Sequence, residues 1–391
     1  MSGPDERLGS ALKGFIEGVC EEIGPRLGTH EQERRAGMRI EEEYKRYCDS
    51  TRLEEFSCHP AAFLDVVRVS VGLYLVGILL YLFLPIVTAI LGALAILLFA
   101  AELMYLKEAV DPLFPRRTGV NVYGKIRPIA TSTRIVLVSG HHDSAYRFPL
   151  HEMLGRRFST FILLTMGLGL VTVVLSFLRF FTLFFLSPFL YVFDWLFVLP
   201  VGSVPLYLVA LRLRSNEVVL GANDNLSGVA VTLGVGELLK EHPLQHTEVW
   251  LVSFACEENM RGSKRFAELH RSELRDAYLL NFDGVGAGEL YILTAEPMYR
   301  TTLTAELCEI AAQAARAEGL AVHMGAPSFG GTDASNFIHA GLRAISIAGI
   351  SKSGFLVNWH TLNDTPDCID EIVLVDAVRL AVGTLKILDM S

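Results

Sequence analysis

Two long apolar stretches dominate the pattern of hydrophobic and polar positions along the chain. Residues 69–101 include no charged side chain, and residues 158–213 include only three. Because about 20 consecutive apolar residues are enough for a helix to cross a bilayer, each stretch has room for two crossings. The pattern therefore predicts two transmembrane hairpins, at residues 66–106 and 158–213.

The pair Leu84-Pro85 marks the expected turn of the first hairpin. Proline cannot continue the hydrogen-bond ladder of an incoming helix, so the spans predicted here are residues 66–84 and 86–106. The alternative is one long, tilted helix with a proline kink.

The second stretch is interrupted by Arg179 and Asp194 near its middle. We expect spans at residues 158–178 and 195–213, with both charges at the far interface, where they cost little. Each insertion leaves and re-enters the same polar domain, so each must cross the membrane an even number of times. The chain is therefore expected to be an integral membrane protein with four spans.

Basic residues near the ends of the spans predict their orientation. Only Arg179 lies on the far side, whereas eight basic residues lie on the side of the polar chain. They are Arg68, Lys107, Arg116, Arg117, Arg156, Arg157, Arg212 and Arg214. By the positive-inside tendency, the polar domain is predicted to be cytoplasmic.

The polar remainder, residues 1–65, 107–157 and 214–391, reads as one interrupted α/β domain. Short β-branched and apolar runs alternate with longer helical patterns, which favours a mostly parallel twisted sheet flanked by helices. The expected strands are residues 134–139, 249–255, 277–282 and 343–348, and the expected helices are 228–239, 262–270, 300–317 and 372–388. Before the first insertion we expect a helix with Leu8, Leu12, Phe15, Ile16 and Val19 on one face, and a solvated surface helix at residues 31–48.

Composition narrows the class of protein. The 391 residues are 51% hydrophobic and 20% charged, and the mean hydropathy of +0.39 is unusual for a soluble protein. The net charge of -9 disfavours a nucleic-acid-binding protein. Six scattered cysteines without a C-x-x-C pair indicate neither a structural zinc site nor a disulfide scaffold.

Acidic and histidine side chains follow three of the expected strands. The first strand runs into His141-His142-Asp143, the second into Glu257-Glu258, and the third into Asp283. Ligands of open α/β sheets bind beyond the carboxyl ends of the strands, so these side chains are expected to converge. Asp224 and His360, in loops, are two further candidates.

Each of these motifs also has an ordinary structural explanation. Asp224 is an acceptable helix N-cap, and Glu257-Glu258 suits a solvated first turn. Taken together, carboxylates and imidazoles in this number suit zinc, which accepts nitrogen and oxygen ligands. Two zinc ions sharing a bridging carboxylate can jointly hold and deprotonate a water molecule. With adjacent glutamates, one side chain can bind metal while its neighbour acts as the base.

The polar chain resembles the di-zinc aminopeptidase family, which also contains glutamate carboxypeptidases and glutaminyl cyclases. The motifs that carry the resemblance are, in chain order, SGHHDS, GANDNLSGVAV, CEENMRGS, NFDGVG, GGTDASNF and NWHTLNDTPD. The segment EEIGPRLGTHEQERRAG is similar to the N-terminal part of that family. The resemblance covers nearly all of the polar chain and none of the apolar stretches, and it implies a zinc-peptidase-like fold.

Carried over by motif, the resemblance implies two Zn²⁺ per chain. His141 and Asp283 would bind one zinc, Glu258 and His360 the other, and Asp224 would bridge them. It also implies Glu257 as the general base and acid, with Asp143 orienting the His141 imidazole.

Two positions depart from the family pattern. A second histidine, His142, follows His141, and Trp359 precedes His360 where some members use a nearby tyrosine hydroxyl to stabilise the oxyanion. Trp359, Asp333 and Phe355 are the candidate substrate-binding residues.

The function expected from these observations is that of a membrane-anchored, zinc-dependent exopeptidase, most plausibly an aminopeptidase that releases N-terminal residues from peptides. The partners are then peptide substrates and the lipid bilayer, with no nucleic acid. Two alternatives stay open: an acyl transferase like glutaminyl cyclase, expected to work with one zinc, and a catalytically silent membrane scaffold or receptor. The intact Glu257 argues against the silent scaffold, because a binding module needs no general base.

Overall fold

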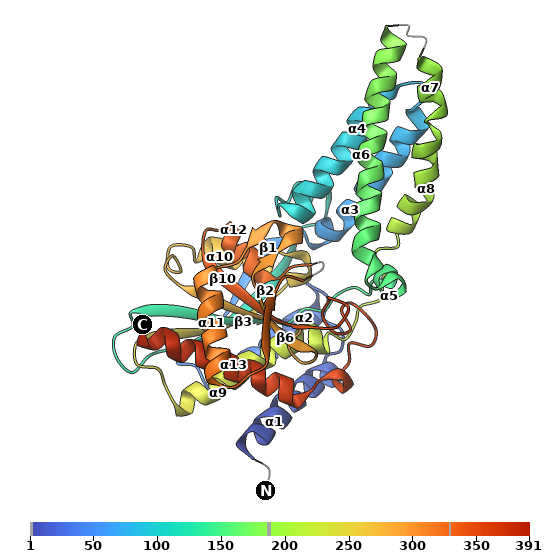
Figure 1. Ribbon diagram of the computed structural model, residues 1–391. Coiled ribbons are helices and arrows are strands. Elements are labelled where there is room, and N and C mark those ends of the chain that lie inside the picture. Colours follow the sequence, from blue (N-terminus) through green and yellow to red (C-terminus); the bar gives the residue numbers. More distant parts are fainter. Residues whose placement is uncertain (1–2, 186–188, 328–329) are drawn as a thin grey trace. The chain divides into compact units, whose positions relative to one another are not determined.

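The computed structural model describes residues 3–185, 189–327 and 330–391 (Figure 1). The chain forms two compact units. The first, called the α/β unit, consists of Met1–Pro60, Arg116–Arg147 and Asn216–Ser391. The second, called the helical unit, consists of Ala61–Pro115 and Phe148–Ser215.

An eight-stranded mixed sheet forms the centre of the α/β unit. Its strands lie in the order β1 (Ser50–Cys58), β2 (Arg117–Ile126), β4 (Thr247–Phe254), β3 (Arg134–His141), β5 (Tyr278–Asp283), β10 (Arg343–Ile350), β6 (Glu289–Leu293) and β9 (Val322–Gly325). The four strands from β4 to β10 are parallel, whereas β1, β2 and β4 pair antiparallel. Strand β6 is antiparallel to β10, and β9 is parallel to β6. The expected flanked α/β sheet is confirmed, with its parallel part at the centre.

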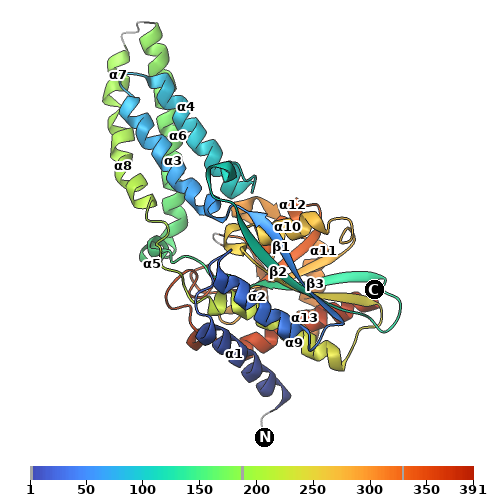
Figure 2. The ribbon, with the colours of Figure 1, turned by 180° about the vertical axis from the view of Figure 1, so that it is seen from behind.

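Helices cover both faces of this sheet. Helices α1 (Pro4–Glu22), α9 (Ser227–Glu241), α11 (Ala305–Ala317) and α13 (Glu371–Met390) form a connected layer, and α2 (Glu31–Tyr44) packs against β2 and α9. Helices α10 (Gly262–Leu269) and α12 (Asp333–His339) pack together on the other side of the sheet (Figures 1 and 2). Residues 136–138 of β3 are all fully buried, as expected for a strand covered on both faces.

Two details of the expected helices were wrong. Helix α2 is not simply a solvated surface helix, because Glu33, Ala36, Ile40 and Tyr44 are buried. The helix expected from residue 300 begins only at Ala305, because the preceding residues pair as the short strands β7 (Ala295–Glu296) and β8 (Thr301–Thr302). The apolar face of α1 is as expected: Leu8, Leu12, Ile16 and Val19 are buried.

The helical unit holds the apolar stretches. Its helices are α3 (Pro60–Leu80), α4 (Pro85–Phe99), α5 (Pro149–Leu154), α6 (Arg157–Phe184), α7 (Leu190–Trp195) and α8 (Val198–Ala210). In the described part of the chain, four helical segments are long and apolar enough to cross a membrane. They are Pro60–Leu80, Pro85–Met104, Arg157–Phe184 and Tyr191–Ala210. The first stretch thus contains two helices, and the single kinked helix is not found.

The second stretch follows the expected pattern with shifted bounds. Helix α6 continues past Leu178 to Phe184, and residues 186–188 of the expected connection lie outside the described residues. The two charges of this stretch pair with each other, because Arg179 Nη2 lies 2.8 Å from Asp194 Oδ1. Mutual pairing lowers the cost of placing both charges among apolar helices.

Hydroxyl groups link the helices of this unit. The Tyr74 hydroxyl lies 2.6 Å from Thr172 Oγ1 and 2.8 Å from Ser203 Oγ, and so connects α3, α6 and α8. One hydroxyl group thus links three apolar helices of the unit.

Candidate metal centre

The residues singled out from the sequence meet at the carboxyl ends of the parallel strands. His141 is the last residue of β3, Asp283 is the last residue of β5, and Glu257 follows β4 by three residues. His141 pairs in register with Phe254, so these parallel strands end side by side. The side chains that follow them therefore share one space, as the topology predicts.

His141 lies at the centre of the first group of ligand-type atoms. Its Nε2 atom is 3.2 Å from Asp224 Oδ1, 3.5 Å from Glu257 Oε2 and 3.9 Å from Asp283 Oδ1. Its side chain is 1% exposed. The imidazole thus faces three carboxylates at once and is almost fully buried.

His360 lies at the centre of the second group. Its Nε2 atom is 3.0 Å from Glu258 Oε2 and 3.4 Å from Asp224 Oδ2. Asp224 therefore turns one carboxylate oxygen toward each histidine. This is the arrangement expected of a carboxylate that bridges two cations.

The donor set fits divalent metal. Two groups of three residues bring their ligand atoms within 4.8 Å of one another: His141, Asp224 and Glu258, and His141, Glu257 and Asp283. Glu258 Oε1 and Asp283 Oδ1 are buried without a hydrogen-bond partner among the described residues. A buried carboxylate oxygen without a donor is costly, and a cation would satisfy both. The assignment of each ligand to a particular zinc, and of Glu257 as the base, stays a prediction.

Burial and mutual repulsion strongly perturb the carboxyl groups. Burial raises the pKa of Glu257 and of Asp283 well above the ordinary range, and neighbouring carboxylates add to both shifts. Burial also opposes ionisation of Asp224, but its contacts with His141 and His360 bring its pKa below the ordinary value. The negative charge of carboxylates crowded in this way must be neutralised by bound protons or by cations. Binding of a metal ion would release such protons.

Asp143 lies between the His141 ring and the turn that carries the two glutamates. Its Oδ1 atom lies 3.3 Å from His141 Nδ1, which makes no hydrogen bond among the described residues, so the role of Asp143 in orienting the imidazole stays a prediction. Its carboxylate oxygens also accept hydrogen bonds from the backbone N–H groups of Glu257 (3.0 Å) and Glu258 (3.2 Å). One buried carboxylate thus connects the His141 ring to the turn that carries both glutamates.

His142 takes no part in the cluster. Its Nδ1 atom lies 2.8 Å from Ser253 Oγ on β4, and its ring also approaches Gly37 of α2. Burial lowers the pKa of His142 to about 3, so the ring is neutral. The geometry thereby separates the two adjacent histidines, which the sequence left ambiguous.

Asp364 is a supporting residue that the sequence did not single out, although it belongs to the motif NWHTLNDTPD. It is fully buried and accepts hydrogen bonds from the backbone N–H groups of Asn223 (2.6 Å) and Asp224 (3.1 Å). Burial, followed by repulsion from Asp224, raises the pKa of Asp364 to about 8. Asp364 therefore holds the turn that carries the bridging carboxylate.

Arg26 is a second such residue, at the beginning of the chain. Its buried guanidinium donates to the carbonyl oxygens of His142 (2.8 Å), Leu220 (2.8 Å) and Gly221 (2.9 Å). It thus ties the segment after β3 to the segment before Asp224. No motif revealed this, because the partners are backbone atoms far apart in the sequence.

The candidate substrate-binding residues lie around the cluster. Asp333 is fully buried at the start of α12, and burial raises its pKa to about 7. The Trp359 ring lies 4.3 Å from that of His360 and stacks on Phe355, which is 2% exposed, at 5.5 Å. Their roles in substrate binding stay predictions.

Tyr299 is a nearby residue that the sequence did not reveal. It is buried, and its pKa is raised well above the ordinary value by burial and then by Glu257 and other acids of the cluster. Its ring packs closely on Gly331, where a Cβ atom would come within 2.2 Å of it. The loop before α12 therefore needs glycine at this position.

A mixed sheet with a buried carboxylate and imidazole cluster at its strand ends defines a zinc-peptidase-like protein. Residues 203–384 match the model of peptidase family M28. A search of curated proteins finds no match.

Solved structures of similar fold include zinc-dependent peptidases and a glutaminyl cyclase. A zinc aminopeptidase from Bacillus subtilis is 16% identical, with a TM-score of 0.55 over 96% of this chain and 94% of that one. A glutaminyl cyclase from an Acidobacteriales bacterium is 14% identical, with a TM-score of 0.58 over 98% and 94%. A Zn-dependent exopeptidase from Parabacteroides distasonis is 15% identical, with a TM-score of 0.56 over 97% of each chain. At these identities the likeness supports the fold and does not separate the activities.

Proposed function

We propose that this chain is a membrane-anchored, zinc-dependent exopeptidase of the aminopeptidase type that holds two zinc ions. The observation that carries the proposal is the placement of the Asp224 oxygens, one 3.2 Å from His141 and the other 3.4 Å from His360. An arrangement for a single metal would not need two histidines on opposite oxygens of one carboxylate. The match of residues 203–384 to peptidase family M28 supports the same assignment.

The ligands would be distributed over the two zinc ions as the motifs imply. His141 and Asp283 would hold one zinc, Glu258 and His360 the other, and Asp224 would contact both. Bound zinc supplies a Lewis acid that polarises a peptide carbonyl and lowers the pKa of water.

Glu257 would move the proton in this reaction. Its carboxylate lies within 3.5 Å of His141 Nε2, and its backbone N–H group is fixed by Asp143. In a closed site this carboxylate can accept a proton from water and return it to the departing amine nitrogen.

Membrane anchoring would come from the helical unit. Large apolar side chains on its helices are exposed, including Leu79 (76%), Leu163 (69%) and Phe184 (68%). Such side chains on several long apolar helices favour contact with lipid over contact with water. With the basic residues counted above, the proposed orientation places the α/β unit in the cytoplasm.

Peptide digestion by the detergent-purified chain tests the proposal. Protein loaded with zinc is incubated with a library of unmodified peptides, and the products are identified by mass spectrometry with and without a chelator. We expect stepwise loss of N-terminal residues that the chelator abolishes, and about two zinc ions bound per chain. Loss of ammonia from N-terminal glutamine without cleavage would instead establish a cyclase, and no chemistry despite full zinc loading would establish a silent scaffold.

A further inference from the structure

Glu33 connects helix α2 to the turn that carries the two glutamates of the metal centre. Its side chain is almost fully buried, with the residue 1% exposed. One carboxylate oxygen accepts a hydrogen bond from the backbone N–H group of Cys256 at 2.7 Å, across 223 positions of sequence. The other accepts from the backbone N–H group of Thr29, also at 2.7 Å. Both oxygens of Glu33 therefore hold backbone, and one of them holds the residue just before Glu257.

The turn held by Glu33 has an unusual backbone. The 3₁₀ turn Glu257–Asn259 is flanked by Cys256 (φ 54°) and Met260 (φ 55°), both in the left-handed region. Residues other than glycine rarely adopt this backbone conformation, so the surrounding structure must maintain it. Glu33 and Asp143 together bind three consecutive N–H groups, those of Cys256, Glu257 and Glu258.

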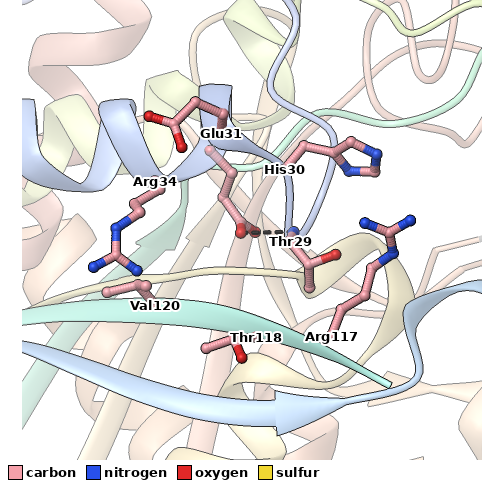
Figure 3. A pocket seen from close by; sticks show the side chains of 8 residues that line it. Thr29, His30, Glu31, Arg34, Arg117, Thr118 and Val120 are labelled. Atoms are coloured by element: carbon pink, nitrogen blue, oxygen red, sulfur yellow. Dashed lines mark hydrogen bonds between the residues drawn. The ribbon is translucent and has the colours of Figure 1, made fainter. Parts of the chain in front are cut away.

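The segment before α2 packs directly on this turn. A Cβ atom on Gly28 would lie 3.2 Å from Cys256 Sγ and 3.3 Å from Asn259 Oδ1. A side chain there would need these neighbours to shift by a few tenths of an ångström, so glycine favours the close approach that brings Thr29 and Glu33 to Cys256. Beside Thr29 lies a cavity of about 370 Å³, bordered by Glu33, Arg117 and Thr118 (Figure 3).

We propose that Glu33 is a positioning residue for catalysis, which sets the direction of the neighbouring Glu257 by fixing the Cys256 N–H group. The expected effect on turnover rests on the proposed function. The expected effect on the backbone of the turn rests on the hydrogen bonds alone. Glu33 touches neither substrate nor metal, and acts through the turn. The charge-rich helix α2 thus contributes to the site through one buried carboxylate.

Amide substitution of Glu33 tests the proposal in the full-length protein. Glu33→Gln keeps the shape of the side chain but replaces one acceptor oxygen with a donor, so it cannot accept from both N–H groups. Glu43→Gln is the matched control, because Glu43 is also buried in α2 but pairs with Arg39 and Arg46 instead of the turn. Thr118→Ala changes the wall of the same cavity and leaves the Glu33 hydrogen bonds in place. It therefore shows whether a change in the cavity alone has an effect.

Two measurements decide the outcome. With leucine p-nitroanilide as the substrate, Glu33→Gln should lower kcat by about 10- to 100-fold, with KM and zinc content near wild type. Backbone hydrogen exchange of residues 255–260, followed by mass spectrometry, should become faster in Glu33→Gln and remain unchanged in both controls. Glu33→Asp, too short to reach both N–H groups, should lose exchange protection as well.

Three results would overturn the proposal. One is unchanged exchange in residues 255–260 of Glu33→Gln, and another is an equal increase in Glu43→Gln. The third is a loss of kcat that only follows a loss of zinc. If the wild-type protein cleaves no peptide, the proposed function fails, yet the exchange measurement still decides whether Glu33 holds the turn.

Discussion

Replacing Asp364 with asparagine should weaken zinc binding without removing a ligand. Asp364 accepts hydrogen bonds from the N–H groups of Asn223 and Asp224 at 2.6 and 3.1 Å. Asparagine retains one acceptor oxygen, so one of these two bonds is lost and a donor faces an N–H group. Because burial raises the pKa of Asp364 to about 8, its carboxyl group is mostly neutral at pH 7, and a hydrogen bond to a neutral acceptor contributes about 0.5–1.5 kcal/mol. If that energy orders Asp224 for metal binding, the affinity for zinc at pH 7 should fall by about 2- to 10-fold.

Competition with a chelator measures this change. Wild type and Asp364→Asn are loaded with zinc and dialysed against graded concentrations of a chelator, and the retained zinc is measured by mass spectrometry. Asp370→Asn is the matched control, because Asp370 caps α13 by accepting from Ile372 N–H at 2.9 Å, and asparagine caps a helix equally well. Equal zinc retention in Asp364→Asn and Asp370→Asn would refute the inference that Asp364 prepares Asp224 for metal.

Three further predictions concern other groups. Glu257→Gln should keep zinc content near wild type and lower kcat by about 100- to 10,000-fold, measured on peptide substrates; normal turnover would exclude Glu257 as the base. His360→Ala should lose one zinc and retain the other, measured as metal per chain; loss of both or neither would contradict the two-site assignment. Burial lowers the pKa of His270, but Glu54 and Glu273 raise it by more, so the net shift is upward. The charged form of His270 therefore stabilises the fold at pH values below the ordinary pKa of about 6.5. This stability is lost as the pH rises through the folded-state pKa. His270→Gln should therefore lower Tm more at pH 6 than at pH 9, by about 2–4 °C per kcal/mol lost, and an equal decrease at both pH values would contradict this reasoning.

The central strands and the cluster of ligand-type side chains were predictable from the sequence because both depend on local patterns. Strands β3, β4 and β5 are apolar runs; β3 ends at His141, β5 ends at Asp283, and Glu257 follows β4 by three residues. The parallel order of such strands brings their ends together without further information. The edge strand β1 was missed because its sequence, STRLEEFSC, mixes charged and apolar positions in the way a solvated loop does.

The supporting groups were not predictable, because their partners are backbone atoms in distant segments. Asp364 accepts from residues 140 and 141 positions away, and Glu33 accepts from one 223 positions away. A charge-rich helix such as α2 normally indicates a solvated surface, and only the fold shows which of its carboxylates is buried. His142 is a similar case: its sequence position beside His141 says nothing about which ring faces the cluster.

The buried acids of this site divide into those that can hold cations and those that hold backbone. Asp224 and Glu258 present their oxygens to the histidines, whereas Glu33 and Asp364 use theirs on N–H groups of two different turns. Because side chains carried by both turns contact His141 and His360, the losses in transition-state stabilisation from Glu33→Gln and Asp364→Asn should not simply add, and the double variant should show a coupling energy of about 0.5–3 kcal/mol. Losses that add within about 0.5 kcal/mol would show that the two turns position their ligands independently.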